Sequence, residues 1–340
     1  MQSLRQFSKL AGVSAATVSR VFSSPEVVAR DTCERILELA QSVGFRPSAV
    51  SKAAFGGKTR SIGVLLPVLN VSYFADIASS LQQALLTDDY LPMVLEKDTN
   101  GERRAVRRLI DHRVDALVIN LIDEGLTPDD FAEMLRAKLP TVLLGPIHAN
   151  LPADIVANDD VRGGILTGEH LAALGHRHFG FCYFGSGHSA SDLRLVGFRQ
   201  AITRHAGQLP DNCITTLPTG LADPEAGDAA VADQLTRILS RPDRPTAIFA
   251  STDILAGIVY KVARQLGLKI PADLSVVGYA NLTFSGLVDP PMTTIDQNGR
   301  EIGRRAAELV LSRLKNPLMP RQSIVVPVQF VDRQSTAPPR

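Results

Sequence analysis

Residues 14–22 carry side chains that could bind nucleic acid from one face of a helix. Ser14 is a good helix N-cap, and Val18, Val21 and Phe22 share one side of the predicted helix. The positions off that apolar side are Ala15, Ala16, Thr17, Ser19 and Arg20. Hydroxyl groups can bind phosphate, and an arginine can donate two hydrogen bonds to a guanine edge. The stretch therefore has the chemistry that a DNA-reading helix needs.

Two further predicted helices support this one. Leu4, Phe7 and Leu10 recur at helical spacing, and Gly12 follows them, where a left-handed helix end is favourable. A third helix is predicted near residues 31–43. Helix, glycine turn, helix and supporting helix is the arrangement that places the second helix in the major groove. Spacing alone does not separate it from a three-helix bundle that binds nothing.

The charge of the chain is unevenly distributed. Its 340 residues have a net charge of +1, but residues 1–60 hold nine Lys/Arg against four Asp/Glu. The first 60 residues therefore carry +5 and the remainder carries −4. A basic segment attached to an acidic body is consistent with contact to a polyanion, although many basic segments are only solvated surface.

The segment from Leu10 to Val21 (LAGVSAATVSRV) resembles the DNA-binding signature of the LacI/GalR family of bacterial repressors. The resemblance implies a DNA-binding helix in which Ala15 and Ala16 occupy the main base-contacting positions. Alanine offers only apolar contact, for example to a thymine methyl group. Arg20 is then expected to make the strongest base contact, and Thr17 and Ser19 are expected to bind phosphate. Ser14 lies at the same surface.

The following segment, Gly44 to Val50, resembles the family's entry to its hinge helix. In that family a hinge leucine wedges into the minor groove, but this chain has Ala54 at that position and Phe55 next to it. Alanine is too short to unstack a base step, so either Phe55 substitutes or the operator is bent less. The sequence from Gly57 to Thr59 (GKT) is not a phosphate-binding loop, because the glycine required five positions earlier is a lysine.

From residue 60 onward, predicted strands and helices alternate in two series. The apolar run 61–68 is typical of a buried parallel strand. The first series ends with the strand 141–144 and the second with the strand 275–279. Each series predicts a doubly wound lobe with its ligand crevice at the carboxyl ends of the strands. A late helix at 300–315 and a strand at 324–330 indicate that the chain crosses back between the lobes.

Five later segments strengthen the resemblance and imply the periplasmic sugar-binding fold for the body. They are Val114–Ile119, Leu174–His178, Ser251–Asp253, Pro291–Ile295 and Arg333–Thr336. The predicted fold is a small all-α helix-turn-helix head plus an α/β periplasmic-binding-protein-like body of two doubly wound lobes. The expected divisions are 1–46 for the DNA-binding domain, 47–60 for the hinge helix and linker, and 61–340 for the effector-binding and dimerisation domain, with lobe 1 at about 61–159 and 296–321 and lobe 2 at about 160–295 and 322–336.

The resemblance also selects residues for an effector, expected to be a sugar or a sugar derivative. Carboxylates and arginines bind sugar hydroxyls by charge-assisted hydrogen bonds, and aromatic rings cover the apolar face of a sugar. Family position selects Asp253 and Arg194 first, although Asp253 could instead cap a helix and Arg194 could form a surface ion pair. The family often has an aspartate where this chain has Ala280. The full set is Tyr73, Phe74, Asp159, Asp160, Arg194, Asp253 and Gln297.

No other chemistry is indicated. The three cysteines are far apart, which favours free thiols, and His176, His178 and His188 lack neighbouring ligands for a metal site. We expect no cofactor, no catalysis, no membrane span and no signal peptide, hence a cytoplasmic protein. The competing hypotheses are a solute-binding protein of sugar transport and a sugar-active enzyme on the same lobes.

The sequence as a whole predicts a transcriptional regulator, most simply a repressor, that acts as a homodimer. Two heads related by a two-fold axis would read a pseudo-palindromic operator on double-stranded DNA. The tail has no leucine heptad for tetramer formation. Effector binding between the lobes would change the order of the hinge, with release of DNA as the default direction.

Overall fold

Three helices form the head of the chain. The computed structural model describes residues 4–46, 58–97, 102–120, 134, 139–146, 153–184, 190–217 and 224–340. Helices α1 (Leu4–Ala11), α2 (Ala15–Ser23) and α3 (Arg30–Ser42) enclose a core that includes Phe7 and Phe45, whose stacked rings lie 3.9 Å apart. The turn before α2 uses Gly12 with φ +66°, a left-handed conformation that glycine adopts without strain.

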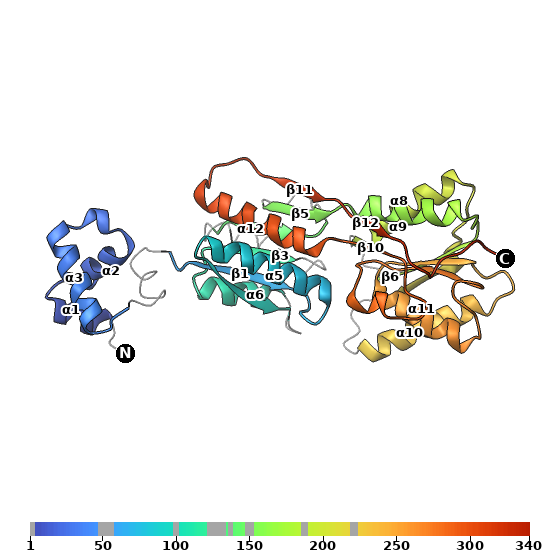
Figure 1. Ribbon diagram of the computed structural model, residues 1–340, viewed down its shortest axis with the longest axis horizontal. Helices are drawn as coiled ribbons and strands as arrows, with labels where there is room; N and C mark the ends of the chain where they lie inside the picture. The colour runs from blue at the N-terminus through green and yellow to red at the C-terminus, as the bar shows by residue number, and fades with distance from the viewer. Residues whose placement is uncertain are drawn as a thin grey trace.

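Lobe 1 is built on a six-stranded, all-parallel sheet (Figure 1). Its strand order is β11-β5-β4-β3-β1-β2, so the strand at one edge of the sheet, β11, comes from near the end of the chain. Helices α5 and α12 cover one face of the sheet, and α6 covers the other. The elements are β1 (Ser61–Leu66), α5 (Ser72–Thr87), β2 (Leu91–Glu96), α6 (Glu102–Asp111), β3 (Ala116–Asn120), β4 (Thr141–Leu144), β5 (Asp154–Asn158), α12 (Gly299–Lys315) and β11 (Ser323–Val326).

Lobe 2 repeats the same plan with a four-stranded parallel sheet of order β7-β6-β8-β9. Helices α8 and α9 pack on one face, around a core of phenylalanines, and α10 and α11 pack on the other. The elements are α8 (Asp160–Ala173), β6 (Phe179–Phe184), α9 (Ala190–Arg204), β7 (Ile214–Leu217), α10 (Pro224–Leu239), β8 (Ala247–Ala250), α11 (Asp253–Gln265) and β9 (Ser275–Val277). Short 3-10 helices lie at Asp211–Cys213 and Thr283–Gly286 in this lobe, and another lies at Pro25–Val27 in the head.

The chain passes between the lobes three times. The first passage comes after β5. The second runs through strand β10 (Thr294–Asp296) and the third through strand β12 (Gln329–Val331), and these two strands pair with each other in an antiparallel ribbon. Figure 1 shows α12 packed against α5 and β11 alongside β5, so two elements from near the end of the chain complete lobe 1. The two doubly wound lobes predicted from the sequence are therefore confirmed, and their ribbon connection fixes where they meet.

The structure corrects three details of the predicted body. Strand β5 was not predicted, and the single strand expected at 324–330 is two strands, β11 and β12, in different sheets. Because β11 pairs with β5 in the lobe 1 sheet, residues 323–326 belong to lobe 1 and not, as expected, to lobe 2. Pro327 separates β11 from β12, and the lack of a backbone N–H at proline ends ladder pairing there.

Several predictions fall outside the described residues. These include the expected helix at 127–137, apart from residue 134, and the hinge pair Ala54 and Phe55. The segments that directly follow β3, β6 and β7, and residues 98–101 after β2, also lie outside them. Within the described part of the chain, no helix is long and apolar enough to cross a membrane.

Candidate functional sites

The first site is the solvent-facing side of α2 in the head. Ser14 is the N-cap of α2, since its Oγ accepts a hydrogen bond of 3.1 Å from the backbone N–H of Thr17. Arg20 is exposed, and Ala15, Ala16 and Thr17 are half-buried along the same helix. The polar and small residues expected to face DNA are thus accessible, with one exception.

That exception is Ser19, which was predicted to lie off the buried side of α2. Its exposed fraction is only 2%, so it belongs to the core side together with Val18 and Val21. Helix α2 packs against both α1 and α3. Two packing partners bury a wider part of the helix surface than the apolar residues of the sequence indicate. A serine this deeply buried is poorly placed to contact phosphate, and the prediction for Ser19 is corrected accordingly.

The second site is a buried charged cluster at the start of lobe 2. Nε of Arg194 lies 2.8 Å from Oδ1 of Asp160, and the Tyr279 hydroxyl donates to the same oxygen at 3.0 Å. The guanidinium also donates from Nη1 to the backbone oxygen of Ser251 and lies 3.7 Å from the centroid of the Tyr279 ring. All four residues are buried, so the ion pair is shielded from water. Arg194 therefore forms an interior ion pair and not the surface pair considered as its alternative role.

Electrostatics in this cluster follow from burial and from the pair itself. Burial disfavours the charged guanidinium, but the Asp160 carboxylate and Tyr279 outweigh it, so the pKa of Arg194 shifts upward. Burial, followed by the neighbouring Asp160 charge, raises the pKa of the Tyr279 hydroxyl well above its usual value. The cluster thus pairs the Arg194 guanidinium with the Asp160 carboxylate, and the Tyr279 hydroxyl donates to that carboxylate.

Two glycines bring the charged partners together. A Cβ on Gly164 of α8 would lie 2.0 Å from the backbone oxygen of Arg194, and a Cβ on Gly197 of α9 would lie 1.9 Å from the oxygen of Val161. Both distances are impossible for any other residue type, so α8 and α9 can approach this closely only with glycine at these positions. This close approach places Asp160, the first residue of α8, against Arg194.

A neutral cluster from lobe 1 lies beside the charged one. The Tyr73 hydroxyl donates to Oδ1 of Asn158 at 2.8 Å, and Nδ2 of Asn158 donates to the backbone oxygen of Gln297 at 2.6 Å. Phe74 packs its ring edge-on to Tyr73 at 5.1 Å. Burial, and after it the charge of Asp160, raises the pKa of Tyr73. Since α5 begins in lobe 1 and α8 begins lobe 2, this interaction joins groups from both lobes.

The two remaining predicted effector residues, Asp253 and Asp159, form hydrogen bonds within the protein. Asp253 is fully buried, and its two oxygens accept hydrogen bonds of 2.7 Å from the Leu282 N–H and 2.6 Å from the Thr294 hydroxyl. It does not cap α11 either, because Thr252 is the N-cap. Asp253 is therefore a structural carboxylate, and the prediction that it faces a ligand is corrected. Asp159 is half-exposed and caps α8 through the Arg162 N–H at 3.0 Å.

Sequence reasoning missed Asn158, Ser251 and Tyr279, which complete the two clusters. Asn158 ends the unpredicted strand β5, so its position at a strand terminus was not visible. Ser251 takes part through its backbone oxygen, which no side-chain pattern reports. Tyr279 lies two residues after the buried strand β9, and a tyrosine near a strand end beside a predicted crevice was the available indication.

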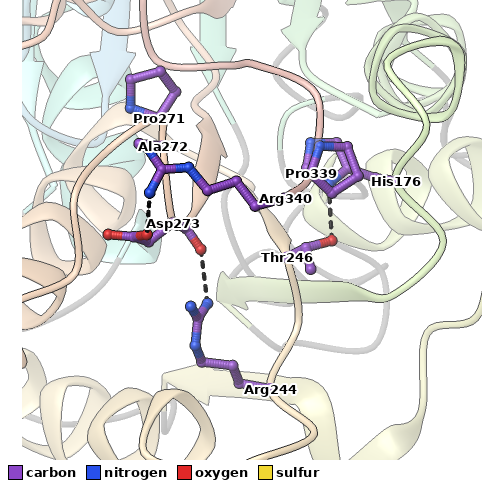
Figure 2. Close-up of a pocket in the computed structure, with 8 residues that line it drawn as sticks. All are labelled: His176, Arg244, Thr246, Pro271, Ala272, Asp273, Pro339 and Arg340. Atoms are coloured by element: carbon purple, nitrogen blue, oxygen red, sulfur yellow. Dashed lines mark hydrogen bonds and ion pairs between the residues drawn. The ribbon is translucent and has the colours of Figure 1, made fainter.

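The pocket in Figure 2 has a different role. It has a volume of about 90 Å³ and is lined by the C-terminal residues Pro339 and Arg340 together with His176. His176 is buried and bonds to the Thr246 hydroxyl at 2.8 Å and to the Ala337 oxygen at 2.9 Å. In the described ranges, no three His, Cys, Asp or Glu side chains gather as a metal site would require. This pocket is where the tail is fastened to lobe 2.

Comparison with known proteins agrees with both halves of the chain. Residues 3–48 match the profile of bacterial regulatory proteins of the lacI family, and residues 169–336 match a periplasmic binding protein-like domain. The HTH-type transcriptional repressor PurR of Klebsiella pneumoniae (strain 342) is 30% identical over 343 residues, covering 99% of this chain and 97% of that protein. The ribose operon repressor of Haemophilus influenzae is 28% identical over 337 residues, with 98% of each chain covered.

Two solved structures extend the comparison. The Lac repressor dimer bound to operator and the anti-inducer ONPF aligns with a TM-score of 0.78 at 25% identity, covering 99% of each chain. A LacI family transcriptional regulator from Enterococcus faecium with bound ribose aligns with a TM-score of 0.71 at 27% identity, covering 82% of this chain and 100% of that one.

A helix-turn-helix head joined to a two-lobed binding body defines a class, the DNA-binding transcriptional regulators that respond to a small molecule. The full-length match to a relative at 30% identity makes the assignment specific. The chain belongs to the LacI family of bacterial regulatory proteins.

Proposed function

We propose that this protein is a repressor that acts in the bacterial cytoplasm as a homodimer and inserts α2 of each head into the major groove of a pseudo-palindromic operator. The observation that carries this proposal is the surface of α2. Arg20 is exposed and makes no ion pair within the described head, while Ser14 and Thr17 lie at the helix start, where backbone amides also point outward. The operator-bound Lac repressor dimer supports the same use of the head.

The helix surface sets what sequence can be read. Ala15 and Ala16 carry methyl groups, which fit thymine methyls but accept or donate nothing. Arg20 is the exposed side chain of α2 that can form a bidentate pair with guanine, and Ser14 and Thr17 fit phosphate contacts. We propose a half-site whose strongest single preference is one G·C pair. The hinge pair Ala54 and Phe55 would act next to it, with Phe55 as the wedge.

Selection from a random duplex library tests the DNA proposal directly. The full chain should enrich a palindromic site, and binding should weaken steeply with salt because phosphate contacts release counterions. Equal affinity for the enriched site and for random duplex at physiological salt would overturn the proposal. An unbent operator in the complex would remove the wedge role of Phe55 and leave the rest intact.

We propose further that a sugar or sugar derivative binds between the lobes, against the clusters described above. Tyr73 and Phe74 supply rings, Gln297 supplies an amide, and Asp160 with Arg194 supplies charged hydrogen-bonding groups, with Asp159 at the rim. Ala280, three residues after the end of β9, offers a methyl group where an aspartate would have accepted hydrogen bonds, which favours a less polar ligand.

A thermal-shift screen of sugars and sugar acids tests this site, because a ligand that binds only the native state raises the melting temperature. The compound that stabilises the wild-type chain should fail to stabilise Asp160→Asn. It should still stabilise Asp211→Asn, because Asp211 lies outside α9 and its exposed partner Arg199 occupies another position on that helix. We expect the ligand to release DNA and to be recovered unchanged. Turnover of the bound sugar would favour the enzyme class instead.

A further inference from the structure

One carboxylate holds the point where the linker enters the body. Oδ1 of Asp115 accepts a hydrogen bond of 3.0 Å from the backbone N–H of Thr59, and Oδ2 accepts one of 2.9 Å from the backbone N–H of Arg60. The Thr59 hydroxyl lies 2.9 Å from the Arg113 backbone oxygen and 3.1 Å from Oδ1 of Asp115, so its single proton can go to either. Two consecutive amides of the linker end are thus bound by one side chain.

The same short segment is fixed from its other side. The Arg60 guanidinium donates to the backbone oxygen of Asp88 at 3.2 Å and lies 5.1 Å from the centroid of the Tyr90 ring. Its backbone oxygen accepts from the Leu91 N–H at 2.8 Å. Residues 59 and 60 are therefore held between the starts of β2 and β3, the two strands that flank β1 in the sheet.

The backbone here is in an unfavourable conformation that these contacts maintain. Arg60 has φ +57° and Arg113 has φ +56°, in the left-handed region that residues with a Cβ seldom occupy. Such conformations persist only where the surroundings determine them strongly, and they concentrate at sites with a mechanical or binding task. Strand β1 begins only at Ser61, so the chain direction just before it is set by these bonds and not by the sheet ladder.

Asp115 lies in the segment 114–119 that resembles the family. It belongs neither to the proposed DNA-binding residues nor to the proposed effector-binding residues, so those two roles do not account for an aspartate at this position. It is far along the chain from the head, which ends at residue 46, and contacts the first residues of the body after the linker. A carboxylate that sets the exit direction of the linker also sets where the head can lie. For a dimer, that direction determines the separation of two heads on DNA.

We propose that Asp115 is a positioning residue for DNA binding: it fixes the linker end at Thr59 and Arg60, and through it the spacing at which two heads bind together. This role rests on the proposed binding of paired heads to a palindrome. A head that binds alone has no need of a fixed partner distance. Paired binding gains from a high effective concentration of the second head, and a linker that is less constrained lowers that concentration.

The test compares the full-length wild-type chain with Asp115→Ala on three duplexes. These are the palindrome that the wild-type chain enriches from a random library, one half-site of it, and the palindrome with one base pair inserted at its centre. We expect Asp115→Ala to bind the palindrome at least tenfold more weakly and the half-site within twofold of wild type. The inserted duplex should be rejected by wild type and discriminated much less by the variant.

Two controls distinguish positioning from general damage. Asp111→Ala removes an exposed carboxylate at the end of α6, four residues away, and should behave as wild type on all three duplexes. If Asp115→Ala does not fold, Asp115→Asn keeps the side-chain shape with one carbonyl acceptor and should show the same loss of spacing preference in weaker form.

Each result decides the question. An unchanged ratio of palindrome to half-site affinity, with unchanged rejection of the inserted base pair, would overturn the role of Asp115. Equal loss on palindrome and half-site would also overturn it, since a purely structural carboxylate would act on both. If the wild-type chain itself prefers no palindrome, operator binding by paired heads fails first, and the positioning role falls with it.

Discussion

The reading surface of the head and the polar clusters of the body solve opposite problems. On α2 the functional groups point to solvent, and Arg20 has no ion pair within the described head. At the lobe junction Asp160 and Arg194 are buried and bonded to each other, to Tyr279 and to a backbone oxygen. A cationic side chain on a DNA-binding surface can stay unpaired in water until DNA supplies the opposite charge. A buried charge needs an oppositely charged partner within the protein, even when no ligand is bound. Substitutions should therefore affect stability in the body and affinity in the head.

The largest effect is expected from breaking the buried pair. Asp160→Ala leaves the Arg194 cation buried without its anion, which costs about 3–5 kcal/mol in comparable interiors. The free energy of unfolding of the body should fall by that amount, and the urea midpoint should move to a lower concentration in proportion. Asp211→Ala removes the exposed partner of Arg199 on the same helix and should leave the transition nearly unchanged. Similar shifts in the two variants would contradict the contrast between the regions.

Close helix packing gives the next largest effect. Gly164→Ala places a methyl group where only 2.0 Å separates it from the Arg194 backbone, so α8 and α9 must move apart, at about 1–3 kcal/mol. Gly257→Ala is the matched control, since its new methyl group would meet only the Phe284 ring at 3.8 Å. Alanine there should be neutral or stabilise α11 by about 0.5–1 kcal/mol. Thermal unfolding of both variants measures the difference.

In the head, Arg20→Ala should change recognition and not stability. We expect a loss of about 1–3 kcal/mol on the enriched site, with relaxed preference at one base pair. Arg30→Ala, which removes an exposed arginine paired with Glu34 on α3, should keep that preference. A uniform loss on every sequence for Arg20→Ala would identify Arg20 as a phosphate contact. Fluorescence anisotropy on single-base variants of the site separates the two results.

The smallest predicted effect concerns pH and the fastened tail. Burial lowers the pKa of His176, so the unfolded chain takes up a proton at a higher pH than the folded chain does. Stability is therefore complete above the unfolded value of about 6.5 and falls as the pH decreases below it. His176→Gln should remove this part of the pH dependence. His205→Gln, an exposed substitution, should retain it in unfolding measured from pH 7 to pH 5.

The same contrast explains how much the sequence could predict. The helices of the head, the cap at Ser14 and the exposure of Arg20 depend on neighbours within a few turns, and local spacing finds them. Ser19 shows the limit, because its burial depends on which two helices pack against α2. Local patterns describe one helix well and the number of its partners poorly.

In the body, distance along the chain decides what could be found. The alternation of strands and helices predicts two lobes, but β5 is five residues long, and it becomes a central strand only through pairing with β11 from 168 residues later. Asp253 follows a strand, as a ligand-binding residue would. Its carboxylate oxygens, however, accept hydrogen bonds from Leu282 and Thr294, 29 and 41 residues later in the chain. The identity of the partner, and not the type of the residue, separates a structural carboxylate from a functional one.

The position of β11 at the sheet edge has a consequence for how the protein is made. During synthesis the head can complete its core once about 46 residues have left the ribosome, whereas lobe 1 lacks one strand and the helix α12 until residue 326 is free. A nascent chain therefore carries a finished DNA-binding head long before it has a finished ligand sensor. Until then β5 exposes an unpaired edge, which a chaperone or the arriving β11 must cover.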